Sequence, residues 1–126
     1  MAKEIIITEN APAPIGPYNQ AVLTGNLLFM AGQVALVPAT GELITSSIAE
    51  ETQQVMANLE AVLTKASMNF SNVIKTTIFL SDMSLFAAVN EVYGKYFTGD
   101  FPARETVAVK GLPKNANVEI SMIAAK

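Results

Sequence analysis

The sequence predicts an α+β domain in which two helices pack on one face of a β-sheet. Strand-like and helix-like segments follow one another in the order strands, helix, strand, helix, strands. Each helical segment has one apolar side, as expected of a helix that covers a sheet. The 126 residues contain no internal repeat and no low-complexity tract, so we expect residues 1–126 to form a single domain.

The first part of the chain predicts three strands and a stiff arm. Lys3 to Thr8 is rich in β-branched residues, which favour a strand. Three of the six prolines fall between Asn10 and Tyr18, so this segment is an arm that either places its terminal tyrosine in a site or packs it on the surface. Ala21 to Thr24 and Leu27 to Ala31 flank Gly25-Asn26, a favourable hairpin turn.

A long helix is predicted next. Ser47 and Glu50 have the spacing of a capping box, and apolar residues then recur on one side as far as about Ala66. The opposite side is expected to lie away from the sheet, and it carries the polar residues Glu51, Gln54, Asn58 and Lys65.

A strand and a second helix follow. Val73 to Leu80 has the strongest β-propensity of the chain. Asp82 can cap a helix whose apolar residues run from Phe86 to Phe97, and Thr98-Gly99 is expected to end it. Asn90 stands beside the apolar side of this helix, where a polar amide is either a packing residue or a ligand contact.

Arg104 is the only arginine in the chain, and it stands at the entrance to a predicted strand from Thr106 to Val109. Its rigid fork of donors matches a carboxylate or a phosphate. Alternation along the strand places Thr106 on the same face as Arg104 and Glu105 on the other. We therefore consider two roles for this arginine, an anion clamp and an ion pair with one of the eleven acidic residues.

Glu119 is an acid set among apolar neighbours in the last predicted strand, Val118 to Ala124. Burial would raise its pKa toward the range of a general base. The alternative is a structural partner for Arg104 or for a lysine. Gly32 follows the second strand of the predicted hairpin, where a glycine indicates a β-bulge or the close approach of another backbone or a ligand.

Composition excludes several classes of function. The net charge of −3 without a basic run disfavours nucleic acid and anionic membrane surfaces as partners. No segment is long and apolar enough to span a bilayer and no signal peptide is recognisable, so we expect a cytoplasmic protein. Cysteine and histidine are absent, which excludes thiolate nucleophiles, histidine-containing triads and the usual ligands of zinc, copper and iron. A hydrophobic fraction of 51% predicts that another subunit covers part of the surface.

Several separated motifs together resemble one family. They are Ala11 to Tyr18, Ala31-Gly32-Gln33, Lys75 to Met83, Val89 to Tyr93, Phe101 to Arg104, and Leu112 to Lys114 with Val118 to Ile120. From about Glu4 to the C-terminus they resemble, in register, the Rid/YjgF family of reactive-intermediate (enamine/imine) deaminases.

The resemblance implies a homotrimer with a chorismate-mutase-like fold, a single mixed β-sheet turned toward the trimer interior, and a site in each cleft between subunits. The implied reaction is hydrolysis of 2-imino acids, such as 2-iminobutanoate and 2-iminopropanoate, to 2-keto acids and ammonia, with no cofactor and no metal. Arg104 falls on the family arginine that holds the substrate carboxylate, and Glu119 on the acid that positions or activates water. The other implied lining positions are Tyr18, Ala31, Gly32, Asn90 and Thr106.

Three residues depart from the family pattern. Ala31 stands where the deaminase branch often has serine, Glu105 where a small residue is usual, and Thr106 where cysteine is common. Glu105 adds a negative charge near a site for an anionic substrate, which predicts weaker activity or an altered substrate preference. The alternative function is therefore a non-catalytic trimeric protein that binds small carboxylates or regulates through the same cleft.

Overall fold

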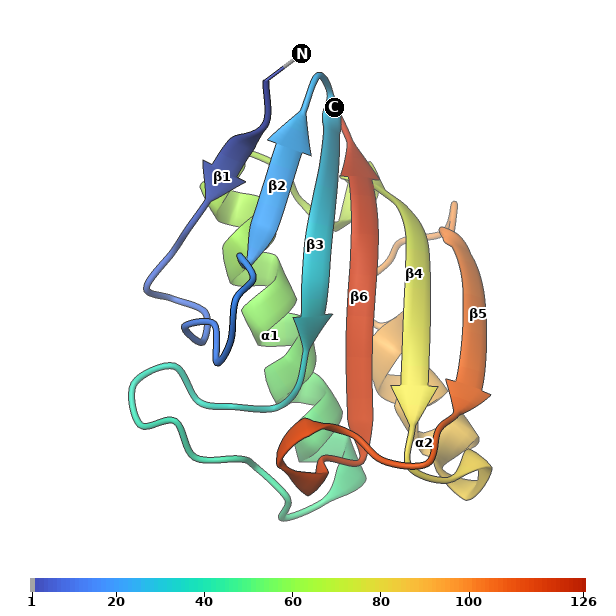
Figure 1. Cartoon of the computed structure of the whole chain (residues 1–126). Coiled ribbons are helices and arrows are strands. Elements are labelled where there is room, and N and C mark those ends of the chain that lie inside the picture. The colour runs from blue at the N-terminus through green and yellow to red at the C-terminus, as the bar shows by residue number, and fades with distance from the viewer. Residues whose placement is uncertain (1) are drawn as a thin grey trace.

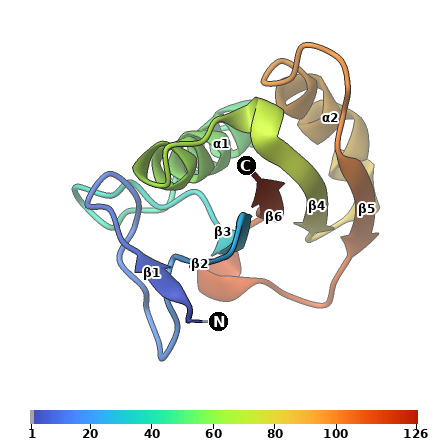
Figure 2. The same ribbon diagram turned by 90° about the horizontal axis from the view of Figure 1, so that it is seen from above.

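The computed structural model describes residues 2–126 as one β-sheet with two α-helices on one face (Figure 1). The strands are β1 (Glu4–Ile6), β2 (Ala21–Thr24), β3 (Leu27–Gln33), β4 (Val73–Leu80), β5 (Ala103–Ala108) and β6 (Val118–Ala125), and the helices are α1 (Ile48–Lys65) and α2 (Phe86–Gly94). The view from above shows both helices on the same side of the curved sheet (Figure 2). The predicted α+β class and the arrangement of the two layers are confirmed.

The six strands lie in the order β1-β2-β3-β6-β4-β5. All neighbours are antiparallel except β4 and β5, which are parallel and are joined through α2. The sheet is therefore mixed, as the resemblance implied. β6 lies between β3 and β4, and β5 forms one edge of the sheet, so Arg104 lies on an edge strand (Figure 1).

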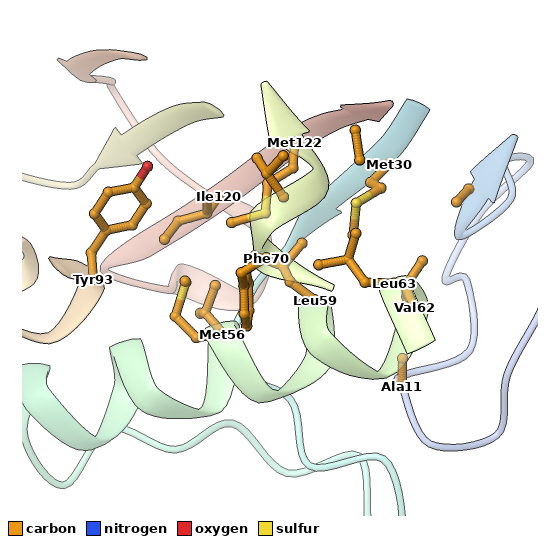
Figure 3. Packing of buried hydrophobic residues seen from close by; sticks show 14 of the residues in the cluster. Ala11, Met30, Met56, Leu59, Val62, Leu63, Phe70, Tyr93, Ile120 and Met122 are labelled. Carbon is orange, nitrogen blue, oxygen red and sulfur yellow. The ribbon is translucent and has the colours of Figure 1, made fainter. Parts of the chain in front are cut away.

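The hydrophobic core fills the space between the helices and the sheet (Figure 3). Alternate residues of β6 face the helices, and the side chains of Ile120 and Met122 are buried against Leu59 and Leu63 of α1. Burial of each such side chain stabilises the fold by about 1.5–3 kcal/mol. This packed core holds the sheet in place, and the sheet in turn fixes the positions of the residues on both of its faces.

The polar side of α1 differs from the prediction, because two of its residues are buried. Glu51 is 1% exposed, and its carboxylate accepts hydrogen bonds from the backbone N–H groups of Asn117 (2.7 Å) and Val118 (3.3 Å). Asn58 is also 1% exposed and donates to the carbonyl oxygens of Val34 (3.2 Å) and Leu36 (2.9 Å). Loops thus pack over this side of the helix, and their backbone groups need polar partners.

Two boundaries also differ. β5 begins at Ala103, so Arg104 lies inside the strand instead of at its entrance. α2 ends at Gly94, before the predicted Thr98-Gly99. A short 3₁₀ turn, Met83–Leu85, precedes α2, and the Asp82 carboxylate caps that turn by accepting a hydrogen bond from the Ser84 N–H group (2.8 Å).

The sheet face away from the helices, here called the open face, exposes large apolar side chains. The strand register places Ile5, Phe29 and Val107 on it, with exposed fractions of 37%, 44% and 43%. An ion pair lies among them, in which Lys75 Nζ is 3.0 Å from Glu105 Oε2. Within residues 2–126, no helix combines the length and hydropathy needed to cross a bilayer.

Candidate functional site

The predicted site residues fall into two groups on opposite faces of the sheet. Arg104 pairs with Thr76 in the register of β4 and β5, and Thr76 is buried on the face that the helices cover. Glu119 pairs with Phe79 and lies on the open face. The two residues expected to share the chemistry therefore do not meet within one chain, and the alternative of an ion pair between them inside the chain is wrong.

The first group surrounds a small cavity of about 50 Å³ next to β3 and β6. Tyr18, Gly32 and Glu119 line it, together with residues of the proline-rich arm and Pro113. Tyr18 is 47% exposed, and its hydroxyl oxygen accepts a hydrogen bond from the Ile15 N–H group (3.3 Å). The arm thus brings Tyr18 to the cavity that Glu119 lines. This position agrees with the first predicted alternative, in which the arm places its tyrosine, and not with simple packing on the surface.

A buried glutamine that the sequence analysis missed holds the arm in place. Gln20 is 2% exposed, and its Oε1 accepts from the Thr8 N–H group (2.8 Å). Its Nε2 donates to the carbonyl oxygens of Thr8 (3.0 Å), Ala11 (3.3 Å) and Pro12 (2.9 Å). The first strand was predicted to extend to Thr8, but β1 ends at Ile6. The backbone groups of Thr8 bond to the Gln20 side chain instead of to a neighbouring strand, and the chain turns toward the cavity.

Gly32 lies against the carboxylate of Glu119. A Cβ atom at Gly32 would lie 2.3 Å from Glu119 Oε2, and the pairing of β3 with β6 shifts register between Met30 and Gln33. The register shift agrees with the predicted bulge, whereas the group that approaches Gly32 is the side chain of Glu119 instead of a backbone or a ligand. Ala31 lies in the same bulge and donates its N–H group to the Gln20 carbonyl oxygen (2.9 Å).

The carboxyl group of Glu119 is half-buried beside this bulge, and burial raises its pKa above the ordinary value of a glutamate. Desolvation disfavours the charged form, since the apolar surroundings replace water. A carboxylate with a raised pKa is a stronger base than an exposed one. The cavity can therefore hold a water molecule near a group that is able to take a proton from it.

If the Glu119 carboxylate acts as a base in a reaction, Gly32→Ala is expected to lower kcat of that reaction at least tenfold while the protein stays folded. The methyl group would displace the Glu119 carboxylate, whose end is flexible enough to move, and misplacement of a catalytic group by about 1 Å can cost about a hundredfold in rate. The kinetics of purified Gly32→Ala check this, with Gly111→Ala as the matched control because a Cβ there would meet no atom within 4 Å. A wild-type kcat in Gly32→Ala would contradict a role of the Glu119 carboxylate as the base.

The second group surrounds a separate cavity of about 310 Å³ at the edge of the sheet. Its lining consists of Asn90, Tyr93, Gly94, Phe101, Pro102 and Arg104. Within residues 2–126 no acidic group pairs with the guanidinium, which instead lies against the rings of Phe86 and Tyr93. Arg104 is thus available to an anion that enters this cavity. The predicted alternative, an ion pair between Arg104 and an acidic residue of the chain, is not formed among residues 2–126.

Thr106 lies on the same face as Arg104, two residues further along β5. Its hydroxyl oxygen is buried and has no hydrogen-bond partner among residues 2–126. Asn90 lies one helical turn before Tyr93, on the side of α2 that faces the guanidinium. Both residues therefore lie on the Arg104 side of the sheet, and neither lines the cavity of Glu119.

Glu105 points away from Arg104, onto the open face. It pairs with Lys75 and accepts a hydrogen bond from the Thr77 hydroxyl (3.2 Å). The hydrogen bond from Lys75 is the main cause of the lowered pKa of Glu105. Within one chain this carboxylate is neutralised on the other face, so the predicted repulsion of an anion bound to Arg104 does not arise there.

The family described as Endoribonuclease L-PSP matches residues 8–126. A RutC family protein of Pyrococcus horikoshii is 50% identical over 124 residues, which are 98% of each protein. A protein of Bos taurus named 2-iminobutanoate/2-iminopropanoate deaminase is 43% identical over 126 residues, covering 100% of this chain and 92% of that protein. A solved structure of a conserved Rid family protein from Yersinia pestis is 44% identical, has a TM-score of 0.96, and covers 99% of this chain and 100% of that one. The similarity thus extends over both cavities.

Proposed function

The chain belongs to the endoribonuclease L-PSP family, to which Rid proteins also belong, and on this premise we propose that it hydrolyses 2-imino acids to 2-keto acids and ammonia. The observation that carries the proposal is the full-length similarity to relatives named 2-iminobutanoate/2-iminopropanoate deaminase. The net charge of −3 favours this small-molecule reaction over RNA cleavage, because a polyanion is bound best by a basic surface.

We infer that the active site forms between two subunits of a homotrimer. The location of Arg104 and Glu119 on opposite faces supports this, because a neighbouring subunit can bring the edge strand β5 against the cavity of Glu119. The apolar open face supports it too, since exposed apolar surface of this kind is typical of subunit interfaces. Each of the three sites would then combine one Arg104 with the Glu119 of the next subunit.

Arg104 binds the substrate carboxylate with its two-pronged guanidinium, which aligns the imine carbon beside Glu119. The protonated imine carbon is already electrophilic. Water attacks it, a C–O bond forms, and Glu119 takes the proton that the water loses. Glu119 then returns the proton to the amine nitrogen, and the C–N bond breaks as the oxygen forms the C=O double bond. The hydroxyl proton passes through Glu119 to the departing ammonia. The products are a 2-keto acid and ammonia, and the balance needs no cofactor or metal.

The remaining site residues shape the pocket. Tyr18 and Gly32 line the cavity of Glu119, which we take as one half-site, and Asn90 lines the cavity of Arg104, which we take as the other. Ala31 adjoins Gly32 in the bulge of β3, and Thr106 lies on the same face of β5 as Arg104. The unpartnered hydroxyl of Thr106 is suited to accept or donate a hydrogen bond when substrate fills the site. We expect a single Rid/YjgF-like domain that acts in the cytoplasm on imino acids released by other enzymes.

The direct test is the decay of freshly generated 2-iminobutanoate and 2-iminopropanoate, trapped with semicarbazide, with and without the protein. Faster loss than in buffer is expected. No acceleration by a folded trimer would contradict the enzymatic proposal and favour a protein that only binds small carboxylates, which titration with 2-oxobutanoate would then detect.

Two inactive variants are expected to restore activity to each other. In mixed trimers of Arg104→Ala and Glu119→Gln subunits, a site is complete where an intact Arg104 meets an intact Glu119 of its neighbour. Every trimer that contains both kinds of subunit has one such site among its three, so about a third of wild-type activity is expected of the purified mixed trimers. Co-expression with two different affinity tags and purification through both tags provides the sample. A mixture as inactive as its parents would mean that both residues act from one subunit.

A further inference from the structure

The guanidinium of Arg104 lies against two aromatic rings of the α2 helix. Its Cζ atom is 5.2 Å from the ring centroid of Tyr93 and 5.6 Å from that of Phe86. Both distances fall within the range in which the face of a ring attracts a cation. Since Arg104 has no ionic partner in residues 2–126, these rings are the contacts that orient its charged end.

The ring of Tyr93 is itself fixed from the sheet. It is 4% exposed, and its hydroxyl lies 2.9 Å from Oγ1 of Thr76, which is fully buried. Thr76 is the residue of β4 that pairs with Arg104 of β5. Figure 3 shows the tyrosine rising from α2 with its hydroxyl at the sheet end. Burial raises the pKa of Tyr93, so the phenol stays neutral and keeps this hydrogen bond.

We propose that Tyr93 and Phe86 are positioning residues for Arg104, and that the hydrogen bond between Tyr93 and Thr76 keeps these rings aligned with β5. The inference rests on the proposed function, because it concerns the side chain assigned to the substrate carboxylate. An arginine with four rotatable bonds must be ordered before both prongs can engage a carboxylate. Rings that order it beforehand remove part of that entropic cost from binding.

The effect is expected in KM and in ligand affinity more than in kcat. Tyr93→Leu should raise KM for 2-iminobutanoate, and Kd for 2-oxobutanoate, about tenfold, because a desolvated ring-to-cation contact is lost. Tyr93→Phe should restore affinity to within about threefold, since the ring remains. Tyr96→Leu is the matched control, because it removes a tyrosine ring that packs on Phe70 (5.4 Å) and does not contact Arg104.

Phe86→Leu provides a second test that does not depend on the core. Phe86 is 37% exposed, so its replacement leaves the fold intact, and an increase of about threefold in KM and Kd is expected. Isothermal titration with 2-oxobutanoate and steady-state kinetics give both quantities. If folded Tyr93→Leu retains wild-type KM and Kd, the positioning role is overturned. If Tyr93→Leu does not fold, unchanged values in Phe86→Leu overturn it.

Arg104→Ala, measured beside these variants, distinguishes a failure of the positioning role from a failure of the role proposed for Arg104. Loss of binding and turnover in Arg104→Ala with wild-type behaviour in the ring variants would reject the positioning role and keep the proposed function. Retention of both by Arg104→Ala would reject the role of Arg104, and the positioning role with it. Only a wild-type protein that does not accelerate the loss of 2-iminobutanoate would reject the proposed function itself.

Discussion

Arg104→Ala is expected to abolish measurable imine hydrolysis while the protein remains folded and trimeric. The guanidinium is the group that binds the substrate carboxylate in our proposal, and removal of one partner of a desolvated charge pair costs about 3–5 kcal/mol. This corresponds to a fall in kcat/KM of about two to three and a half orders of magnitude. The semicarbazide-trapping assay, combined with size-exclusion chromatography, measures the rate and the assembly together.

Arg104→Lys is the informative companion to this variant. Lysine keeps the charge and loses the fork, so an intermediate rate would show how much of the effect comes from two-pronged recognition. Lys75→Ala is the control for removal of a cation elsewhere on the sheet, because Lys75 pairs with Glu105 on the open face. Stability should change by only about 1 kcal/mol in Arg104→Ala, since its contacts in the chain are the two rings. Unchanged turnover would sink the mechanism.

Glu119→Gln is expected to lower kcat by about two to four orders of magnitude and to leave the affinity for 2-oxobutanoate within a few-fold of wild type. The amide has nearly the shape of the acid and cannot accept the proton from water. Stopped-flow kinetics and titration calorimetry separate the two quantities. A variant that loses ligand affinity in proportion to rate would indicate that Glu119 only shapes the pocket.

The pH dependence follows from the raised pKa of Glu119. The wild-type rate should fall as pH decreases through that pKa, at a higher pH than for an exposed glutamate, because the base becomes protonated. The folded state binds this proton more tightly than the unfolded chain. The free energy of unfolding therefore decreases as pH rises from the ordinary to the raised pKa and stays at the lower value above it. At neutral pH, Glu119→Gln should thus melt at the wild-type temperature or slightly above.

Much of the fold could be predicted because local patterns agree with the final packing. β2 and β4 have the predicted bounds, and Ser47 caps α1 by accepting a hydrogen bond from the Glu50 N–H group (3.1 Å). The burial of Glu51 and Asn58 could not be predicted, because it depends on loops that reach α1 from 22 to 67 residues away. The periodicity of apolar residues predicts which side of a helix packs on the sheet. It does not indicate which loops cover the other side of that helix.

The sequence singles out Arg104 and Glu119 as candidate site residues, and it does not show how they are arranged. Arg104 and Glu119 were distinguished by residue type and by neighbours, which the sequence displays. Their separation depends on which face of each strand the helices cover, and this follows only from the register of β4 with β5 and β6. Tyr93 was interpreted as part of an apolar side, since nothing in the sequence marks a buried hydroxyl as the partner of Thr76.

The central position of β6 bears on the order in which the protein can form during synthesis. β6 lies between β3 and β4, yet the ribosome makes it after every other strand of the sheet. Until it emerges, β3 and β4 each expose an unpaired edge, and their inner apolar side chains have no strand between them. Assembly of the sheet, of the half-site at Glu119 and of any subunit interface must therefore wait until translation has passed residue 125. Until then the nascent chain exposes unpaired strand edges and apolar side chains, which are the surfaces that chaperones shield from aggregation.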